Sequence, residues 1–426
     1  QKRIKQVMHI DNNKTEIAII GISGKFPQSD SVDELWSNLL NKKISIEEFP
    51  ENRNFNFQNY YSPNLKTPNK TYLKRGGFLK NIKSFDPLFF NISPKEAEYI
   101  DPSEKLFLEE SWKAIEDAGY DPFKLEKEKW GVFSCAKGDY GVEILKKAPT
   151  YYMPTDSNAN GRLSYFLNLN GPSMNIDTAC SSGLTAISIA CDNIALKNCD
   201  GAIVGGGGIN SSLNTIISSS QSLLFSPSSS CNPFDQKADG TVIGESICTV
   251  ILKEKNKAIN DGDYIYGIIK GWGTNQDGRT NGLTAPSGNA QYNLREDVFK
   301  KAGIEAKDID YIETHGTGTS LGDRIEFNSL QKTFENCQRS MNRCILGSIK
   351  SNIGHTFFAS GLVSVIKVIL SFKNKMFPPQ AGLDKVHKDI DIESSPFVFL
   401  KNPEKWEGKK ISGINSFGAT GSNAHV

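Results

Sequence analysis

The spacing of apolar residues along the chain changes between two periods. A short continuous apolar run before Gly21 predicts a buried strand, while segments with apolar residues three or four apart predict helices. The first such helix follows Ser31, which stands three residues before Glu34 in the spacing of a capping box. Another begins at Pro102 and ends at Gly119. Strands and helices therefore alternate from the start.

The rest of the pattern continues this alternation. Predicted strands are KWGVFSCA, SMNIDTA, DGAIVGGGG, SICTVILK, YIYGIIKGWGTN, DIDYIETHG, CILGSIKS and KKISGINSFG. Helices are predicted over 181–198, 288–302 and 357–373 and near 324–335. Residues 45–95 are expected to form a long irregular excursion over the surface. The alternation favours an α/β fold with helices covering buried sheets, and the similar order of elements in both halves indicates a duplication.

Composition narrows the class of protein. The chain has 426 residues, 38% apolar and 23% charged, which is ordinary for a globular protein with a large core. A net charge of +1 gives no reason to expect nucleic acid or a membrane as partner. No apolar stretch approaches about 20 residues, and the polar start has no apolar core of a secretion signal. We therefore expect a cytoplasmic domain, cut from a longer polypeptide.

The cysteines divide into two kinds. Eight are present without a CxxC pair or a Cys/His metal pattern, so no metal site is expected. Cys191, Cys248 and Cys344 lie inside apolar runs and are expected to be buried, reduced thiols. Cys180 stands instead between a predicted strand and a predicted helix. A helix start stabilises a thiolate and lowers a thiol pKa, which favours a reactive cysteine; a buried thiol at a tight turn is the alternative.

Two of the five histidines stand at the ends of predicted elements. His315 ends a buried strand, and His355 precedes a helix, whereas His9, His387 and His425 lie in polar, charged or terminal segments. Together with the cysteine, the pair forms a plausible Cys/His/His site. Cysteine proteases use one histidine with an orienting amide or carboxylate. Two imidazoles suit a thioester carbonyl whose oxygen becomes negative, as Claisen-type carbon–carbon bond formation requires.

Four separated motifs now point to a family. DTACSSGL, ETHGTGTSLGD, KSNIGH and NSFGATGSNAHV resemble the motifs of the β-ketoacyl synthases, most closely those of the ketosynthase domains of type I polyketide synthases. The resemblance covers about residues 15–426 and implies an α/β fold of the thiolase type, a duplicated five-layered αβαβα sandwich, and a homodimer. It divides the chain into a polar leader (1–14), an N-terminal half with the nucleophile (15–258) and a C-terminal half with both histidines (259–426).

The resemblance implies a reaction and its partners. Cys180 matches the nucleophile that accepts an acyl chain, and His315 and His355 match the pair that binds the malonyl-type extender and stabilises its enolate. The activity implied is the decarboxylative Claisen condensation of polyketide chain elongation, an acyl transfer. The domain is expected to bind no cofactor, because the phosphopantetheine arm of an acyl carrier protein brings the substrate. An acyltransferase and other domains are expected on the same polypeptide.

Further positions match supporting roles in that family. Lys350 matches a lysine that orders the site, and Glu326 matches a carboxylate that pairs with His315. Three departures from the family pattern stand elsewhere: Arg324 replaces a usual proline, Ser246 replaces a usual glycine, and SPSSSCN replaces a loop that is typically charged.

The resemblance also assigns groups that contact the substrate. The backbone N–H groups of Cys180 and Phe417 match an oxyanion hole, and Phe417 resembles a gating residue beside the thiol. The hydroxyls of Thr317 and Thr319 match those that bind the phosphopantetheine arm.

Several alternatives stay open. A thiolase or chalcone-type synthase would act on coenzyme A directly, but the HGTGT and KSNIGH motifs speak against it. A fatty acid synthase ketosynthase would share the chemistry and use saturated acyl chains. A docking domain of the same fold would not elongate, although such domains usually lose a catalytic residue. GGGG at 205–208 lacks the helix and Lys-Ser/Thr of a phosphate-binding loop and is interpreted as close backbone packing.

Overall fold

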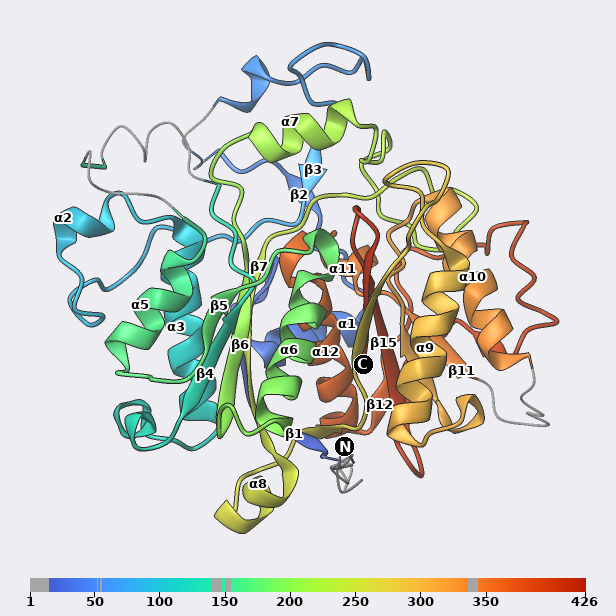
Figure 1. The fold of residues 1–426 in the computed structure, drawn as a ribbon. Coiled ribbons are helices and arrows are strands. Elements are labelled where there is room, and N and C mark those ends of the chain that lie inside the picture. The colour runs from blue at the N-terminus through green and yellow to red at the C-terminus, as the bar shows by residue number, and fades with distance from the viewer. Residues whose placement is uncertain (1–14, 52, 54–55, 140–147, 150–154, 336–343) are drawn as a thin grey trace, which may run out of the picture.

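Two six-stranded mixed sheets form the centre of the molecule (Figure 1). The computed structural model describes residues 15–51, 53, 56–139, 148–149, 155–335 and 344–426. Strands of the first sheet follow the order β5-β4-β6-β7-β1-β8, and those of the second the order β13-β11-β10-β15-β16-β9.

The elements have the following bounds. The first sheet contains β1 (Ile17–Lys25), β4 (Trp130–Ser134), β5 (Ser173–Asn175), β6 (Gly201–Gly208), β7 (Ser246–Glu254) and β8 (Gly267–Ile269). The second contains β9 (Gly273–Gln276), β10 (Tyr311–Glu313), β11 (Cys344–Gly347), β13 (Phe397–Val398), β15 (Ser412–Phe417) and β16 (Ser422–His425). The helices are α1 (Val32–Leu40), α2 (Pro94–Ala97), α3 (Pro102–Asp117), α5 (Asn158–Phe166), α6 (Ser182–Ala195), α7 (Asn214–Gln221), α8 (Lys255–Asp261), α9 (Gly288–Ala302), α10 (Ser320–Phe334), α11 (Lys350–Ile353) and α12 (Ser360–Asn374).

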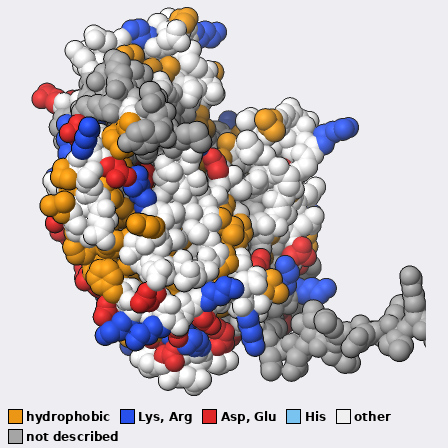
Figure 2. All heavy atoms as spheres, turned by 60° about the vertical axis from the view of Figure 1, so that its left-hand side comes forward, with side chains coloured by type: hydrophobic (Ala, Val, Ile, Leu, Met, Phe, Trp, Pro, Cys, Tyr) orange, Lys and Arg blue, Asp and Glu red, His pale blue; other side chains and the backbone are white. Residues whose placement is uncertain are grey.

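Helices α6 and α12 lie between the two sheets, and each contacts strands of both (Figure 1). Helices α3 and α5 pack on the outer face of the first sheet, and α9 and α10 on the outer face of the second. This is the predicted five-layered αβαβα order, so the fold prediction is confirmed. On the outer side of α3, Trp112 packs against Phe89 and Phe123, and Figure 2 shows hydrophobic side chains gathered over this side of the molecule.

The two halves have the same topology. If the strands of each half are numbered in chain order, β1, β4, β5, β6 and β7 give the sheet order 3-2-4-5-1, and β9, β10, β11, β15 and β16 give the same order. The fifth strand of each half is antiparallel to both of its neighbours. In each half the helix that follows the third strand becomes a central helix. The shared topology therefore indicates a duplication.

The two central helices begin with the same local structure. A single 3-10 turn precedes each: η3 (Ala179–Ser181) before α6 and η5 (Phe357–Ala359) before α12. The first residue of each turn has a positive φ, 54° and 44° respectively. Both helices then start with the letters SGL. This short internal repeat lies at structurally equivalent positions, and no further sequence similarity between the two halves is visible.

The central helices cross closely because each carries a glycine in its first turn. A Cβ on Gly183 would lie 3.0 Å from the backbone N of Leu362, and a Cβ on Gly361 would lie 2.7 Å from the backbone N of Leu184. Gly183 thus faces Leu362, which follows Gly361, and Gly361 faces Leu184, which follows Gly183. Any side chain at these positions would force the two helix starts apart.

Three sequence predictions need correction or comment. YIYGIIKGWGTN, predicted as one strand, forms β8 in the first sheet and β9 in the second, and the chain crosses between the sheets at Gly271, where a Cβ would lie 2.9 Å from the Ala302 side chain of α9. Helix α10 begins at Ser320, before the expected 324. The boundary between halves at residue 258 stays a prediction, since β8 follows it and pairs with β1.

Two apolar segments are explained by their place in the core. The helical run Phe357–Asn374 has the length and hydropathy of a membrane span, but 72% of it is buried, as its place between the sheets requires. In β6, a Cβ on Gly206 would lie 2.5 Å from the backbone N of Ala136, and one on Gly207 would lie 1.9 Å from the carbonyl O of Ser246. The interpretation of GGGG as close backbone packing is confirmed.

We predict that Gly361→Ala destabilises the protein although alanine is the better helix former. The added methyl group collides with Leu184, which costs about 1–3 kcal/mol as overpacking and exceeds the helix-propensity gain. Gly161→Ala in α5 is the matched control, because a Cβ there meets nothing within 4 Å, and it should gain about 0.5–1 kcal/mol. Urea unfolding followed by tryptophan fluorescence measures both, and a midpoint of Gly361→Ala at or above wild type would contradict the close crossing.

Candidate active site

Cys180 is held in the 3-10 turn that precedes α6. It therefore lies just before the helix, which begins at Ser182. The turn is fixed from both sides, because the Ser182 hydroxyl donates to the carbonyl O of Ala179 at 2.7 Å and accepts from the N–H of Thr178 at 2.9 Å. Ala179 has a φ of 54°. A left-handed backbone at a residue other than glycine costs about 1–3 kcal/mol and is concentrated at functional sites.

Residues of the C-terminal half cover the turn that holds Cys180. The Ser416 hydroxyl of β15 donates to the carbonyl O of Cys180 at 2.8 Å. The backbone N–H of Ala419, in the turn between β15 and β16, interacts with the thiol. Only 6% of Cys180 is exposed. Cys180 thus belongs to one half, and the residues that cover it belong to the other.

Burial decides the charge of the Cys180 thiol. Desolvation raises its pKa to about 11, and the positive charge of Lys350 and the N–H of Ala419 offset only part of that effect. The expectation that a helix start would lower the thiol pKa is therefore wrong for the resting site, because loss of water outweighs the helix. Burial raises the pKa values of Cys135 and Cys231 further, to about 12, although the charge of Lys350 also lowers that of Cys231.

His315 follows β10 and is held at two points. Its backbone N–H donates to Glu326 Oε1 at 2.8 Å. Its ring Nδ1 accepts from the backbone N–H of Phe417 at 3.3 Å, and the two rings lie 5.4 Å apart. The expected pairing of Glu326 with His315 is thus made through the backbone, and the carboxylate does not contact the imidazole.

His355 lies beside it, between α11 and the turn before α12. Its ring Nδ1 accepts from the backbone N–H of Phe357 at 3.3 Å, and its ring stacks on that of Phe357 at 4.7 Å. The ring centroids of His315 and His355 are 5.6 Å apart, with the planes nearly perpendicular. The two histidines predicted from the sequence are therefore neighbours.

The hydrogen bonds fix the protonation of both rings. Since each Nδ1 accepts a backbone N–H, the proton of each neutral imidazole sits on Nε2. Burial, together with the charge of Lys350, holds the pKa of both His315 and His355 well below the usual range. The pair therefore offers two neutral Nε2–H donors at working pH and has no free lone pair for a proton.

Lys350 is the charged residue that acts on Cys180 and on both histidines. It opens α11, is 1% exposed, and its Nζ has no hydrogen-bond partner within the residues that the structure describes. Burial lowers its pKa, and the carboxylates of Glu313 and Glu326 act in the opposite direction. The same ammonium perturbs the pKa of the cysteine and of both histidines, so all four side chains share one electrostatic environment.

Two acidic residues that sequence reasoning missed support the site. Glu313 of β10 is fully buried, accepts the N–H of Ile349 at 2.7 Å and pairs with Lys367 of α12 at 2.7 Å. These contacts fix the position of the carboxylate relative to Lys350, whose pKa it raises. An acid inside the apolar strand DIDYIETHG is the signal that could have identified it. Asp323 of α10 is 2% exposed, and burial raises its pKa to about 7.

Asp323 organises the loop that follows His315. Its Oδ1 accepts the backbone N–H groups of Thr317 at 3.1 Å and Gly318 at 3.2 Å, and its Oδ2 accepts that of Phe234 at 2.8 Å. The hydroxyls of Thr317 and Thr319 then lie 3.0 Å apart. The two threonines predicted to act together are thus adjacent at the start of α10.

Two of the three departures from the family pattern, Arg324 and Ser246, are accommodated separately. Arg324 donates to the carbonyl O of Ser320 at 2.9 Å and to Asp389 Oδ2 at 2.6 Å, so the arginine makes a basic contact with a neighbouring loop. Ser246 opens β7, is fully buried, and its hydroxyl has no hydrogen-bond partner in the described part of the chain. Nothing in the structure explains why serine replaces glycine there.

Comparisons with known proteins agree with this geometry. Residues 14–258 match the family model "Beta-ketoacyl synthase, N-terminal domain", and residues 266–384 match "Beta-ketoacyl synthase, C-terminal domain". The chain therefore belongs to the β-ketoacyl synthase family, and it is an acyltransferase. The prediction made from its motifs is confirmed.

Individual relatives narrow the assignment of the chain within this family. Polyketide synthases PksL and PksM of Bacillus subtilis (strain 168) are 38% and 40% identical to it over its whole length, which spans about a tenth (10%) of each of them. Among solved structures, the oxazolomycin ketosynthase domain OzmH KS7 of Streptomyces albus has a TM-score of 0.93 at 35% identity, with 96% of this chain and 74% of that chain covered. The module 6 ketosynthase of the bacillaene synthase from Bacillus subtilis 168 has a TM-score of 0.89 at 38% identity, with 96% and 71% covered. This chain is a ketosynthase domain of the polyketide synthase type.

The buried thiol generates a pH prediction. Because only the thiolate reacts and its pKa is about 11, the rate at which iodoacetamide labels Cys180 should rise about tenfold per pH unit between pH 7 and 9.5, without a plateau. Lys350→Met removes the charge that lowers this pKa, so labelling at each pH should be slower. Peptide mass spectrometry measures both rates, and a plateau below pH 8 in the wild-type protein would contradict the raised pKa.

Proposed function

We propose that this ketosynthase elongates a chain by decarboxylative Claisen condensation, with Cys180 carrying the acyl group and His315 and His355 binding a malonyl-type extender on an acyl carrier protein. The observation that carries the proposal is the pair of neutral Nε2–H donors, fixed by backbone N–H groups on each Nδ1. Two such donors stabilise a developing enolate oxygen without giving up a proton.

The first step loads Cys180. Its sulfur attacks the carbonyl carbon of an acyl thioester, the bond from that carbon to the phosphopantetheine sulfur breaks, and the thiol proton ends on the departing sulfur. Because neither imidazole has a free lone pair, we assign that proton directly to the leaving thiolate. The charge of Lys350 assists by lowering the thiol pKa from the value that burial alone would give.

The second step consumes the extender. Loss of carbon dioxide leaves an enolate whose oxygen accepts from the Nε2–H groups of His315 and His355. Its carbon attacks the acyl carbonyl on Cys180, a carbon–carbon bond forms, and the carbon–sulfur bond to the enzyme breaks. The Cys180 thiolate leaves and takes a proton from water, while the product stays on the carrier protein as a β-ketoacyl thioester.

Backbone groups and hydroxyls complete the proposed site. The N–H groups of Cys180 and Phe417 form the oxyanion hole of both steps. That of Phe417 also donates to His315 Nδ1 at 3.3 Å, so an oxyanion would share this donor with the ring in a three-centre hydrogen bond. The hydroxyls of Thr317 and Thr319, 3.0 Å apart, hold the phosphopantetheine arm, and Phe417 gates the approach to the thiol.

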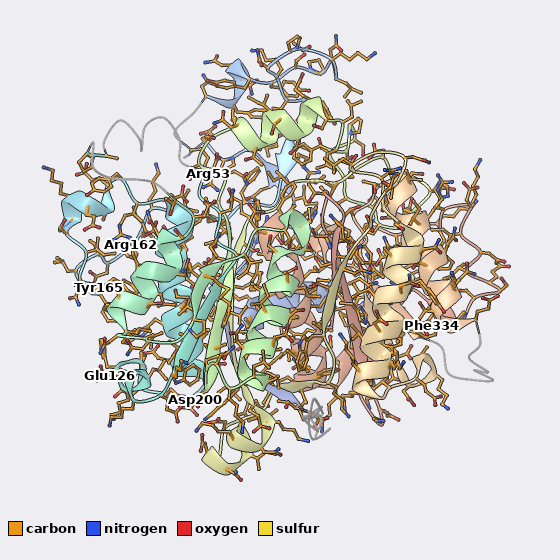
Figure 3. All side chains as sticks on the ribbon, in the orientation of Figure 1. Arg53, Glu126, Arg162, Tyr165, Asp200 and Phe334 are labelled. Carbon is orange, nitrogen blue, oxygen red and sulfur yellow. The ribbon has the colours of Figure 1, made fainter. Side chains whose placement is uncertain are left out.

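A homodimer is proposed from the edge of the first sheet. Strand β5 ends the sheet and has one neighbour, β4, in the part of the chain that the structure describes. The strand itself contains Met174, 37% exposed, and the adjacent helix α5 carries Tyr165, 86% exposed and labelled in Figure 3. An unpaired edge strand beside apolar side chains suits pairing with a second copy. A cytoplasmic location and neighbouring domains on one longer polypeptide belong to the same proposal.

We predict that Cys180→Ala abolishes self-acylation and condensation. The variant lacks the sulfur to which the acyl group binds, while the neighbouring turn is held by Ser182 and needs no thiol. Incubation with an acyl carrier thioester followed by intact-protein mass spectrometry shows whether the acyl mass is added. Full condensation activity of the variant would refute the assignment.

We predict that His355→Ala still acylates itself but loses decarboxylation of malonyl thioester by about 10²–10³-fold, because one of two oxyanion donors is lost. His387→Ala is the matched control, because His387 is not one of the two proposed donors. It contacts Ser320 at the start of α10, at 3.4 Å. Release of labelled carbon dioxide measures the step. Equal release by His355→Ala and His387→Ala would count against the role of His355.

A further inference from the structure

A chain of buried hydrogen bonds runs from β16 to the backbone of His315. His425 Nδ1 lies 2.8 Å from Asn415 Oδ1, and the two residues face each other directly across β16 and β15. Asn415 Nδ2 donates to Glu326 Oε1 at 2.8 Å. The same oxygen accepts the N–H of His315 at 2.8 Å. The side chains of His425, Asn415 and Glu326 belong to residues that are at most 2% exposed.

The direction of this chain is determined. Because Asn415 Nδ2 donates to Glu326, its Oδ1 must be the acceptor toward His425, and His425 Nδ1 must carry a proton. Burial and the nearby charge of Arg295 lower the pKa of His425 to about 3, so the ring stays neutral. Its Nε2 has no hydrogen-bond partner within the described residues. His425 is therefore a fixed donor with a single tautomer.

Glu326 depends on Asn415 for its orientation. Its Oε2 accepts the N–H of Gly316 at 2.9 Å, so both oxygens hold the backbone that carries His315. Within the described residues, Asn415 is the only side chain that donates to this carboxylate. Arg295 is close enough to interact electrostatically, but its Nε donates to Thr333 at 3.1 Å. Without the amide of Asn415, one of the three hydrogen bonds that fix the carboxylate is lost.

Strand β15 therefore holds His315 at both ends. Asn415 acts on the backbone through Glu326, and Phe417, two residues along the same strand, donates its N–H to the ring Nδ1. A shift of Asn415 would move the backbone of His315 relative to its ring contact and so re-aim its Nε2–H.

We propose that Asn415 and His425 are positioning residues for the decarboxylation step: the relay from His425 through Asn415 sets the orientation in which Glu326 holds His315. This inference rests on the proposed function, because it assigns the relay to the step that needs the imidazole donor. The relay contacts no atom of the thiol, so self-acylation of Cys180 should not depend on it.

The decisive variant is Asn415→Asp, which keeps the size of the side chain and replaces its donor by an acceptor. Two carboxylates then face each other, and the hydrogen bond to Glu326 returns only when one proton is shared between them. Asn423→Asp is the matched control. Asn423 lies in β16, is 1% exposed, and donates to Asp277 at 2.7 Å, so its replacement creates a similar carboxylate pair that does not touch Glu326.

The expected result is a loss that depends on pH. At pH 8, Asn415→Asp should decarboxylate malonyl carrier thioester about 100-fold more slowly than wild type, the cost of a misplaced catalytic group, with self-acylation retained. Between pH 8 and 6 the ratio to wild type should recover, because a protonated carboxyl donates in place of the amide. Asn423→Asp should show neither the selective loss nor the recovery, even if it lowers the melting temperature.

A second pair of variants tests the far end of the relay. His425→Asn can place an N–H donor near the position of Nδ1 and should retain decarboxylation, whereas His425→Leu should lose it selectively. Equal decarboxylation by these two variants, or a pH-independent ratio for Asn415→Asp, would overturn the relay while leaving the proposed function intact.

A readout independent of activity separates the two proposals. If the wild-type protein itself released no carbon dioxide, the proposed function would fall, and the relay would be judged by spectra of protein labelled with ¹⁵N-histidine. The His315 ring signals, assigned with His315→Ala, should shift in Asn415→Asp and not in Asn423→Asp. Unchanged signals in Asn415→Asp would overturn the relay.

Discussion

The close crossing of α6 and α12 is the constraint on which the site depends. Gly183 and Gly361 remove the side chains that would keep the helices apart, so each helix start reaches the backbone of the other. The 3-10 turns before these helices then lie in contact. Cys180 sits in one of these turns and His355 just before the other. The distance between Cys180 and His355, the proposed nucleophile and donor, is thus set by backbone packing, which leaves little freedom for either side chain.

Burial has opposite effects on the two kinds of group that we propose to act in catalysis. It disfavours charge, so it keeps both imidazoles neutral, which is the form that donates, and it keeps the Cys180 thiol protonated, which is the form that does not attack. Lys350 changes the balance in one direction for all three groups: its charge favours the thiolate and further disfavours imidazolium. A buried cation without a hydrogen-bond partner is costly, and this double effect is a physical reason for its position.

The sequence predicted those features that depend on local pattern. Residues at the ends of apolar runs, Cys180, His315 and His355, were found because a polar or reactive group at such a junction is unusual. Features made by pairing across strands could not be found, since nothing local relates Asn415 to His425 or either to Glu326. The pKa of the thiol was also beyond reach: a helix start is visible in the sequence, whereas the loss of water that outweighs it comes from β15 and the turn that follows.

The duplicated topology explains why the catalytic groups are divided between the halves. In each half the third strand leads into a central helix, and the pseudosymmetry brings the two helix starts to the same place. The position equivalent to Cys180 in the second turn is Phe358, as the alignment of ACSSGL with FFASGL shows. One copy of the turn thus carries Cys180, the proposed nucleophile, and the segment before the other carries His355, a proposed oxyanion donor. Neither half alone contains both groups, so the chemistry can arise only where the two helices cross, and any substitution that separates them acts on every step of the reaction at once.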